Sequence, residues 1–308
     1  MNEARASIKA AATRIEPYIR RTPVITASGF GLGFPVELKL EHLQYSGSFK
    51  ARGAFNSLLS AEIPAAGIVA ASGGNHGAAV AHAASRLGHR ARVYVPEIAG
   101  PAKIALIRRT GADLVQVAGS YDDALKEALV YEAETGAMQV HAYDAPATVL
   151  GQGTLAAEWQ AQGLTADTLL IAVGGGGLIA GALSWFNGAR KIVAVEPALA
   201  PTLNRALQTG PDTEVDVSGV AANALGARRI GKIAHRLAQE QAITSLTVSD
   251  DAIVRAQHLL WADLRVLVEP AGAVALAALT SQAYVPDRNE RVAVLLCGGN
   301  ISPDPVSR

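Results

Sequence analysis

The sequence contains a single cysteine, Cys297, which has no second thiol with which to form an internal disulfide. No cluster of cysteine and histidine has the spacing of a structural metal site. Chains without disulfides are typical of reducing compartments, so we expect a cytoplasmic protein.

Neither positive nor negative charge is in excess, because the chain has 27 lysines and arginines and 27 aspartates and glutamates. Such a chain has no net field to attract nucleic acid or an anionic membrane surface, so small molecules are the expected partners. Aromatic residues make up only 5%, whereas half of the residues are hydrophobic and glycine occurs 30 times. This composition favours an α/β enzyme over a disordered or fibrous chain.

Neither a signal peptide nor a membrane span is predicted. Residues 1–19 carry charges every few positions and are typical of an amphipathic helix. The uncharged run 168–189 is long enough to raise the question of a span, but four glycines at 174–177 interrupt it. We interpret this run as a strand, a turn and a helix.

Short β-rich runs alternate with helical patterns along the chain, whose 308 residues suit two lobes. Parallel strands joined by crossover helices are the usual product of such alternation. We therefore predict an α/β fold with two mostly parallel sheets. The predicted strands include 67–72, 91–97, 113–119, 168–173, 191–196 and 292–297, and the predicted helices include 75–88, 100–111 and 120–136.

Lys50 ends the stretch Ser-Gly-Ser-Phe-Lys and precedes a helical run at 51–60. The dipole at a helix start and a partly apolar setting both disfavour an extra positive charge, which lowers the pKa of a lysine and eases imine formation with an aldehyde. A solvated surface lysine is the alternative, and only the context of other motifs decides against it.

Two glycine-rich stretches follow predicted strands and open helices. In the first, residues 71–77, free backbone amides can bind a carboxylate or phosphate; an ordinary loop capped by Asn75 is the alternative. In the second, residues 173–178, the geometry is that of a phosphate cradle. This second stretch also fits the dinucleotide pattern through Gly175, Gly177 and Ala180, with Glu196 further on, so a nicotinamide-binding turn is a rival hypothesis.

Cys297 begins a Cys-Gly-Gly-Asn stretch that follows the run Val-Ala-Val-Leu-Leu at 292–296. A small thiol at a strand terminus can hydrogen-bond a neutral ring nitrogen without forcing a proton onto it. A buried cysteine without a function is the alternative.

Together these motifs resemble the fold-type II pyridoxal-phosphate enzymes, and within them the serine/threonine dehydratase (threonine ammonia-lyase) and serine racemase branch. The resemblance implies a two-lobed fold like that of the tryptophan synthase β subunit and covers nearly the whole chain. Its motifs are Ser46 to Gly53, Ser72 to Gly77, Gly151 to Thr154, Gly174 to Leu178, Val195 to Pro197, Glu269 to Gly272 and Cys297 to Asn300.

The resemblance also implies a role for individual residues. Lys50 would hold the cofactor as an imine and act as the catalytic base, with Phe49 packed on the ring and Asn75 bonded to the ring hydroxyl. Cys297 would face the pyridine nitrogen. The phosphate would be held by Gly174, Gly175, Gly176, Gly177 and Leu178, and the substrate carboxylate by Ser72, Gly73, Asn75 and His76.

The implied reaction converts L-threonine or L-serine to a 2-oxo acid and ammonia. Racemases of this branch carry a second serine where Gly73 stands, so serine racemization is a weaker alternative. Elimination from 3-hydroxyaspartate or another hydroxy-amino acid is a further alternative. Leu129 disfavours an acidic substrate, because it stands where a basic residue would be expected to bind a second carboxylate. Outside this class of reaction, a carrier that holds the cofactor without turnover and a nicotinamide-dependent oxidoreductase stay open.

The family's cation site uses a glutamate, a backbone carbonyl and an aspartate. In this chain Glu196 matches the glutamate and Ala200 would supply the carbonyl, but Thr202 stands in place of the aspartate. A monovalent or weakly held divalent cation is therefore expected rather than tight Mg²⁺. A strand-end carboxylate paired with a nearby base is the alternative for Glu196.

The lobes are expected to divide the chain into a large cofactor-binding domain, 1–46 with 146–308, and a small inserted domain, 47–145. The resemblance further implies a homodimer, no nucleic-acid or membrane partner, and a hydroxy-amino acid as the small-molecule partner.

Overall fold

A computed structural model describes residues 3–97, 99, 101–119 and 121–301. Within this part of the chain, one sheet has six strands in the order β1-β2-β10-β7-β8-β9. All neighbours run parallel except β1 and β2, which form an antiparallel pair at one edge. The strands are β1 (Val24–Ala27), β2 (Val36–Lys39), β7 (Thr168–Ala172), β8 (Lys191–Pro197), β9 (Thr244–Val248) and β10 (Val292–Leu295).

The second sheet, within the same described ranges, has four parallel strands in the order β5-β4-β3-β6. Its strands all come from one continuous stretch of the chain, whereas the larger sheet takes strands from both sides of that stretch. They are β3 (Ile68–Ala71), β4 (Ala91–Pro96), β5 (Asp113–Val117) and β6 (Met138–Gln139).

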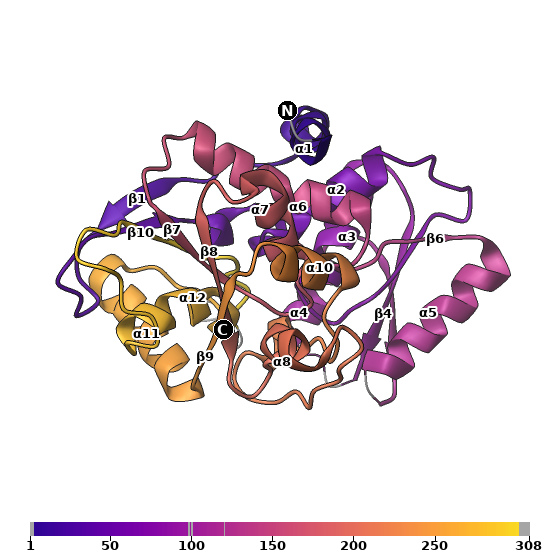
Figure 1. The fold of residues 1–308 in the computed structure, drawn as a ribbon. Helices are drawn as coiled ribbons and strands as arrows, with labels where there is room; N and C mark the ends of the chain where they lie inside the picture. The colour runs from indigo at the N-terminus through magenta and orange to yellow at the C-terminus, as the bar shows by residue number, and fades with distance from the viewer. Residues whose placement is uncertain (1–2, 98, 100, 120, 302–308) are drawn as a thin grey trace.

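The two sheets form separate lobes, with α6 and α7 between them (Figure 1). Helix α6 packs on α2, α7 and α1. The helices are α1 (Glu3–Ile15), α2 (Lys50–Leu59), α3 (Asn75–Arg86), α4 (Pro101–Arg108), α5 (Tyr121–Thr135), α6 (Pro146–Ala161), α7 (Gly177–Phe186), α8 (Thr202–Thr209), α9 (Ala222–Leu225), α10 (Lys232–Glu240), α11 (Asp250–Leu264) and α12 (Pro270–Thr280). Short 3₁₀ turns are η1 (Glu16–Tyr18), η2 (Glu41–Leu43) and η3 (Tyr45–Gly47).

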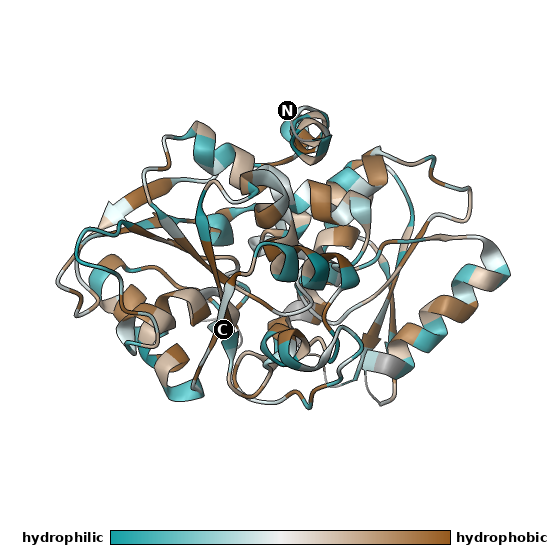
Figure 2. Cartoon of the chain, in the orientation of Figure 1, coloured by the Kyte–Doolittle hydropathy of each residue, from teal (hydrophilic) through white to brown (hydrophobic). Residues whose placement is uncertain are grey.

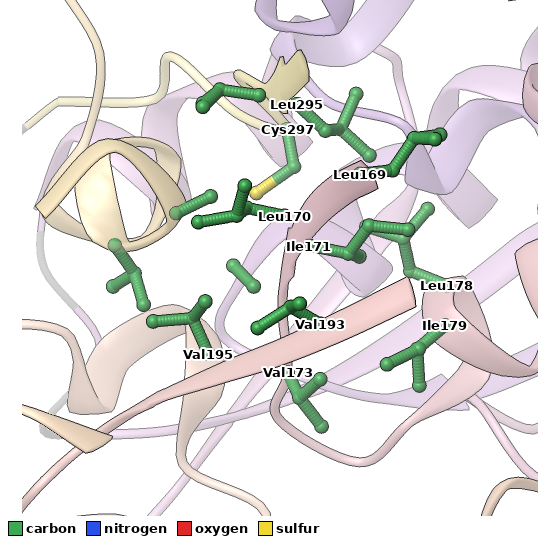
Figure 3. Packing of buried hydrophobic residues seen from close by; sticks show 14 of the residues in the cluster. Leu169, Leu170, Ile171, Val173, Leu178, Ile179, Val193, Val195, Leu295 and Cys297 are labelled. Atoms are coloured by element: carbon green, nitrogen blue, oxygen red, sulfur yellow. The ribbon is translucent and has the colours of Figure 1, made fainter. Parts of the chain in front are cut away.

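The central strands are buried on both faces, as expected for parallel strands covered by helices. Every residue of β7 and β10 is buried, and hydrophobic colour runs along the strands, whereas α5 alternates between hydrophobic and hydrophilic turns (Figure 2). Side chains of β7, β8 and α7 interlock in the core of the larger lobe (Figure 3). This packing fixes the carboxyl ends of β7 and β10, where two of the motifs lie.

The predicted α/β fold with two mostly parallel sheets is confirmed. The run 168–189 forms β7, a glycine turn and α7, as interpreted. The antiparallel β1–β2 pair was not predicted, because both strands are short and their sequences carry no clear alternation. The lobe boundaries at 46/47 and 145/146 stay predictions.

Among the described residues, none of the helices combines the length and the apolar character that crossing a bilayer requires.

Candidate active site

Lys50 is the first residue of α2, and its side chain points toward the end of β6. Its Nζ donates a hydrogen bond to the carbonyl of Ala142 at 2.7 Å and lies 5.3 Å from the centre of the Phe49 ring. Burial lowers the pKa of Lys50 to about 8. The surface-lysine alternative is therefore wrong, because Lys50 lines a pocket and its amine bonds a backbone carbonyl.

The segment before Lys50 forms backbone hydrogen bonds with the residues that follow β10, about 250 residues further along the chain. Ser48 and Gly298 form an isolated antiparallel bridge, and the backbone N–H of Phe49 donates to the Cys297 carbonyl at 3.1 Å. These backbone bonds bring Lys50 and Cys297 into one pocket without help from their side chains.

Cys297 is buried beside the apolar side chains of β7 and β10 (Figure 3). Its Sγ lies 3.5 Å from the carbonyl oxygen of Ala271. Burial, aided by the negative charge of Glu269, raises the pKa of Cys297 to about 12, so the thiol stays neutral over the physiological range. A neutral, weakly donating group therefore stands where the resemblance places the partner of the pyridine nitrogen.

The glycine loop between β7 and α7 has no space for side chains. A Cβ on Gly174 would lie 2.9 Å from the Cα of Leu225, and a Cβ on Gly175 would collide with the ring of Tyr143. Gly176 caps α7 with a φ of 92°, a conformation that favours glycine. The loop thus offers bare backbone amides at a helix start, the geometry of an anion cradle.

Tyr143 was not predicted as a site residue, although it covers the glycine loop. Its hydroxyl lies 3.3 Å from the carbonyl of Arg229, and the neighbouring Asp144 accepts a hydrogen bond from the backbone N–H of Ile233 near the start of α10. These bonds hold the segment that carries the Ala142 carbonyl against the larger lobe. No signal in the sequence drew attention to Tyr143.

The loop before α3 is held from within. The Ser72 hydroxyl accepts a hydrogen bond from the Gly74 backbone at 3.1 Å, and His76 Nε2 lies 2.7 Å from the Val140 carbonyl. Burial, with a smaller contribution from the charge of Lys50, lowers the pKa of His76 to about 3. His76 is therefore neutral and serves to fix the loop against β6, as a structural histidine does.

Gly73 lies in a crowded place. A Cβ at this position would lie 2.5 Å from the Cβ of Ala99 and 3.1 Å from a methyl group of Val95. A serine at this position would require Ala99 or Val95 to move.

Asn75 belongs to a buried polar chain that the sequence did not reveal. Its Nδ2 donates to the carboxylate of Glu269, and its Oδ1 accepts from Asn300 Nδ2 at 2.8 Å. Glu269 directly precedes α12 and is buried. The carboxylate of Glu269 therefore orients the Asn75 amide.

Glu196 is buried at the end of β8, where its two carboxylate oxygens accept the backbone N–H groups of Leu203 and Asn204 at 2.7 Å each. Burial, only partly offset by these bonds, raises the pKa of Glu196 to about 7. The carboxylate thus caps α8. This role accounts for Glu196 without the basic partner of the alternative interpretation and without the ribose contact of a dinucleotide. Ala200 is buried nearby, and no group of three or more metal-binding side chains occurs among the described residues. A cation at Glu196 and Ala200 stays a prediction.

One pocket joins all of the predicted cofactor residues except Asn75. The substrate-loop residues Ser72, Gly73, Asn75 and His76 are not part of its lining. Asn75 approaches Gly298, the residue after Cys297, because a Cβ on Gly298 would lie 3.4 Å from Asn75 Nδ2. Leu129 is exposed on α5 and does not line this pocket, so it carries no information about the substrate. The lining consists of Phe49, Lys50, Tyr143, Ala172, Val173, Gly174, Gly175, Gly176, Gly177, Leu178, Ala224, Leu225 and Cys297.

These residues fit pyridoxal phosphate. The glycine loop has free amides that would hold a phosphate, Lys50 has an amine of lowered pKa for the aldehyde, and Cys297 contributes a neutral thiol to the same pocket. Residues 15–298 match the family model described as pyridoxal-phosphate dependent enzyme. The chain belongs to this family, and its cofactor is pyridoxal 5'-phosphate.

Similar proteins narrow the class further. The chain is 37% identical to the phenylserine dehydratase of Ralstonia pickettii over 93% of this chain and 90% of that protein. It is 34% identical to the L-threonine ammonia-lyase of Geobacter sulfurreducens over 97% of this chain and 76% of that one. The solved structure of maize serine racemase superimposes with a TM-score of 0.92 at 30% identity, covering 98% of this chain and 95% of the other. This chain is a pyridoxal-phosphate-dependent lyase, and the nicotinamide hypothesis is wrong.

Proposed function

We propose that this lyase converts L-threonine or L-serine to the corresponding 2-oxo acid and ammonia. The observation that carries the proposal is the desolvated amine of Lys50, which shares one pocket with the glycine loop and the neutral thiol of Cys297. The names of the similar ammonia-lyase and dehydratase support the same chemistry.

Lys50 is proposed to take the α-proton of the substrate. The hydrogen bond to the Ala142 carbonyl holds Nζ in place, and the lowered pKa of about 8 keeps a useful fraction of the amine unprotonated. The bound cofactor supplies the electron sink that makes this proton acidic. The α-proton and β-hydroxyl leave as water, and hydrolysis of the released enamine gives the 2-oxo acid and ammonia.

Other residues hold the reactants. The amides of the glycine loop bind the cofactor phosphate, and those at the start of α3, after Ser72, bind the substrate carboxylate. Asn75, oriented by Glu269, bonds the ring hydroxyl. Cys297 would present a neutral thiol to the ring nitrogen, and such a partner would favour loss of the β-hydroxyl over reprotonation of the substrate.

Elimination is proposed in preference to racemization because of Gly73. Racemization needs an acid on the face opposite Lys50, and Gly73, at the position where the racemases carry a serine, has no side chain to supply one.

The proposal is tested with purified holoenzyme. Threonine and serine are expected to yield 2-oxo acid, and Lys50→Ala is expected to lose this activity together with the absorbance that borohydride treatment removes. Lys126→Ala, which alters an exposed lysine on α5, serves as the matched control. Faster formation of D-serine than of pyruvate would favour the racemase, and a bound cofactor without any product would favour a carrier.

We further propose a cytoplasmic homodimer whose partner is a small hydroxy-amino acid. Light scattering of the purified protein tests the dimer.

A further inference from the structure

A chain of hydrogen bonds runs from the turn before Lys50 to the start of α12. Asn300 Nδ2 donates to the Ser46 carbonyl and to Asn75 Oδ1, at 2.8 Å each. Asn75 Nδ2 in turn donates to the carboxylate of Glu269. Asn75 and Glu269 are buried, so water competes little for these bonds. The amide of Asn75 is therefore held from both sides.

The direction of each bond in this chain is fixed at the two ends. The Ser46 carbonyl can only accept a hydrogen bond, so Asn300 must present its nitrogen there. The same nitrogen faces Asn75, which must then present its oxygen. At the other end the Glu269 carboxylate also accepts, so the nitrogen of Asn75 must face it. An amide turned the other way would set donor against donor and acceptor against acceptor.

Glycines make room for both ends of the chain. A Cβ on Gly47, whose φ is 75°, would collide with the side-chain oxygen of Asn300. A Cβ on Gly298 would collide with the carboxylate of Glu269. The backbone N–H of Gly299 donates to the Gly47 carbonyl at 2.8 Å, which sets the following residue beside this turn. The two consecutive glycines before Asn300 therefore allow both polar groups to approach the amide between them.

This polarity decides which atom of Asn75 is offered to the cofactor. The Asn75 nitrogen carries two hydrogens; Glu269 accepts one, and the second is the one proposed for the ring hydroxyl. A hydrogen-bond donor stabilises the ionised form of a phenolic hydroxyl, whereas an acceptor stabilises the form that keeps its proton. The direction of the bonds at Asn75 thus bears on the ionisation of the cofactor hydroxyl.

We infer that Asn300 is a positioning residue that acts through Asn75 and, together with Glu269, makes this amide a donor to the ring hydroxyl of the cofactor. The inference rests on the proposed function, because it needs the cofactor to be bound with its ring hydroxyl at Asn75. It deepens that function by giving a role to a side chain that is not among the described residues lining the pocket.

An exchange of functional groups tests this polarity. Asn300→Asp combined with Glu269→Gln moves the carboxylate to the other end of the chain and keeps side-chain size and the number of carboxylates. The new carboxylate at position 300 accepts and the new amide at position 269 can donate, so the Asn75 amide turns round and offers its oxygen to the ring hydroxyl. The ratio of ionised to neutral hydroxyl, measured from the absorbance bands of the bound cofactor, is expected to fall at least about tenfold. A ratio like that of the wild type would overturn the inference.

The stability of the apoenzyme separates positioning from a purely structural role. Asn300→Asp alone sets two carboxylates against one amide, so we expect Tm in calorimetry to decrease by about 2–5 °C. Adding Glu269→Gln should recover part of that loss, because the reversed chain is again satisfied at Asn75. The absorbance ratio should not recover with it. A structural role would restore Tm and the absorbance ratio together, and that result would refute the inference.

A simpler variant keeps the inference testable if the exchanged pair does not fold. Asn300→Ala is expected to weaken binding of pyridoxal phosphate at least about threefold, because the amide is no longer held toward the hydroxyl. Binding of 3-deoxypyridoxal 5'-phosphate, which lacks this hydroxyl, should change by about twofold or less. Asn204→Ala is the matched control, because Asn204 Nδ2 on α8 also donates to a backbone carbonyl, that of Ser245 at 3.2 Å, and it should leave both affinities unchanged. Equal weakening of the two ligands by Asn300→Ala would count against the inference.

Turnover of threonine and serine by the same preparations separates this inference from the proposed function. If the absorbance ratio changes as expected but the wild type forms no 2-oxo acid, the proposed threonine and serine activity fails and the role of Asn300 stands. If the wild type forms 2-oxo acid but the exchanged pair keeps the wild-type ratio, the role of Asn300 fails and the activity stands.

Discussion

Replacing Arg52 with methionine tests how the start of α2 is held. Arg52 follows Lys50 by two residues and is fully buried. Its guanidinium donates to both carboxylate oxygens of Glu41, at 2.6 and 3.0 Å, and to Glu158 at 2.9 Å. Lys39, also buried, donates to Glu158 at 2.5 Å. The cluster therefore contains two cations and two anions and links α2 to β2, η2 and α6.

The charges of this cluster support one another. Burial on its own would raise the pKa of Glu158, but the positive charges of Arg52 and Lys39 outweigh it and hold the pKa below its usual value. Arg52→Met keeps most of the side-chain volume but leaves Glu41 without its charged partner. Loss of one member of a buried ion pair costs about 3–5 kcal/mol. For a chain of 308 residues the entropy of unfolding is about 0.6 kcal/mol/K, so we expect Tm to decrease by about 5–8 °C.

Differential scanning calorimetry of the apoenzyme gives this shift. Arg236→Met is the matched control, because Arg236 forms an exposed pair with Glu240 on α10 at 3.0 Å. An exposed helical pair contributes about 0.3–0.5 kcal/mol, so the control should shift Tm by about 1 °C or less. Combining Arg52→Met with Glu41→Gln restores the charge balance and should recover part of the loss. Equal shifts for Arg52→Met and Arg236→Met would refute this account of the cluster.

Three further predictions concern the site itself. Gly73→Ser is expected to lower Tm and to yield no D-serine, and adding Ala99→Gly should recover stability because it removes the contact with the new side chain. Rapid racemization by the single variant in chiral analysis would contradict this crowding. Because burial lowers the pKa of Lys50 to about 8, the neutral fraction of the amine should rise about tenfold between about pH 7 and 9. The rate at which the apoenzyme binds the cofactor, measured by stopped-flow absorbance, should rise with it, and a flat profile would argue for a solvated amine. Cys297→Ser keeps a neutral group and should retain the rate of 2-oxo acid formation, whereas Cys297→Asp should lower this rate at least about tenfold by placing a second carboxylate near Glu269. Similar rates for the two variants would contradict the requirement for a neutral group at position 297.

Strands and glycine turns were predictable because their signals are local. Alternation of β-rich and helical runs gave β3, β4, β5, β7, β8 and β10 to within one or two residues, whereas β1, β2, β6 and β9 were not predicted. Gly176 needs a positive φ that follows from its place in a strand-to-helix turn. The motif around Lys50 likewise carries its information in five consecutive residues. Side-chain periodicity also identified the amphipathic helix at the N-terminus, where α1 and η1 form.

Partners distant in the sequence were not predictable in the same way. The pairing of Asn75 with Glu269, the ring of Tyr143 over the glycine loop and the buried cluster of Arg52 each join elements far apart along the chain. Hydrophobic periodicity reports which face of an element is buried, but it does not say which other element lies against that face.

The sequence by itself determined the α/β fold, the family motifs and the residues that can hold the cofactor, since each depends on backbone geometry and residue chemistry within a few positions. Only the tertiary structure decided that burial lowers the pKa of Lys50, that Gly73 has no room for a side chain, and that Tyr143 covers the glycine loop. Those properties depend on the packing of surrounding atoms, and this packing exists only once the two lobes have come together.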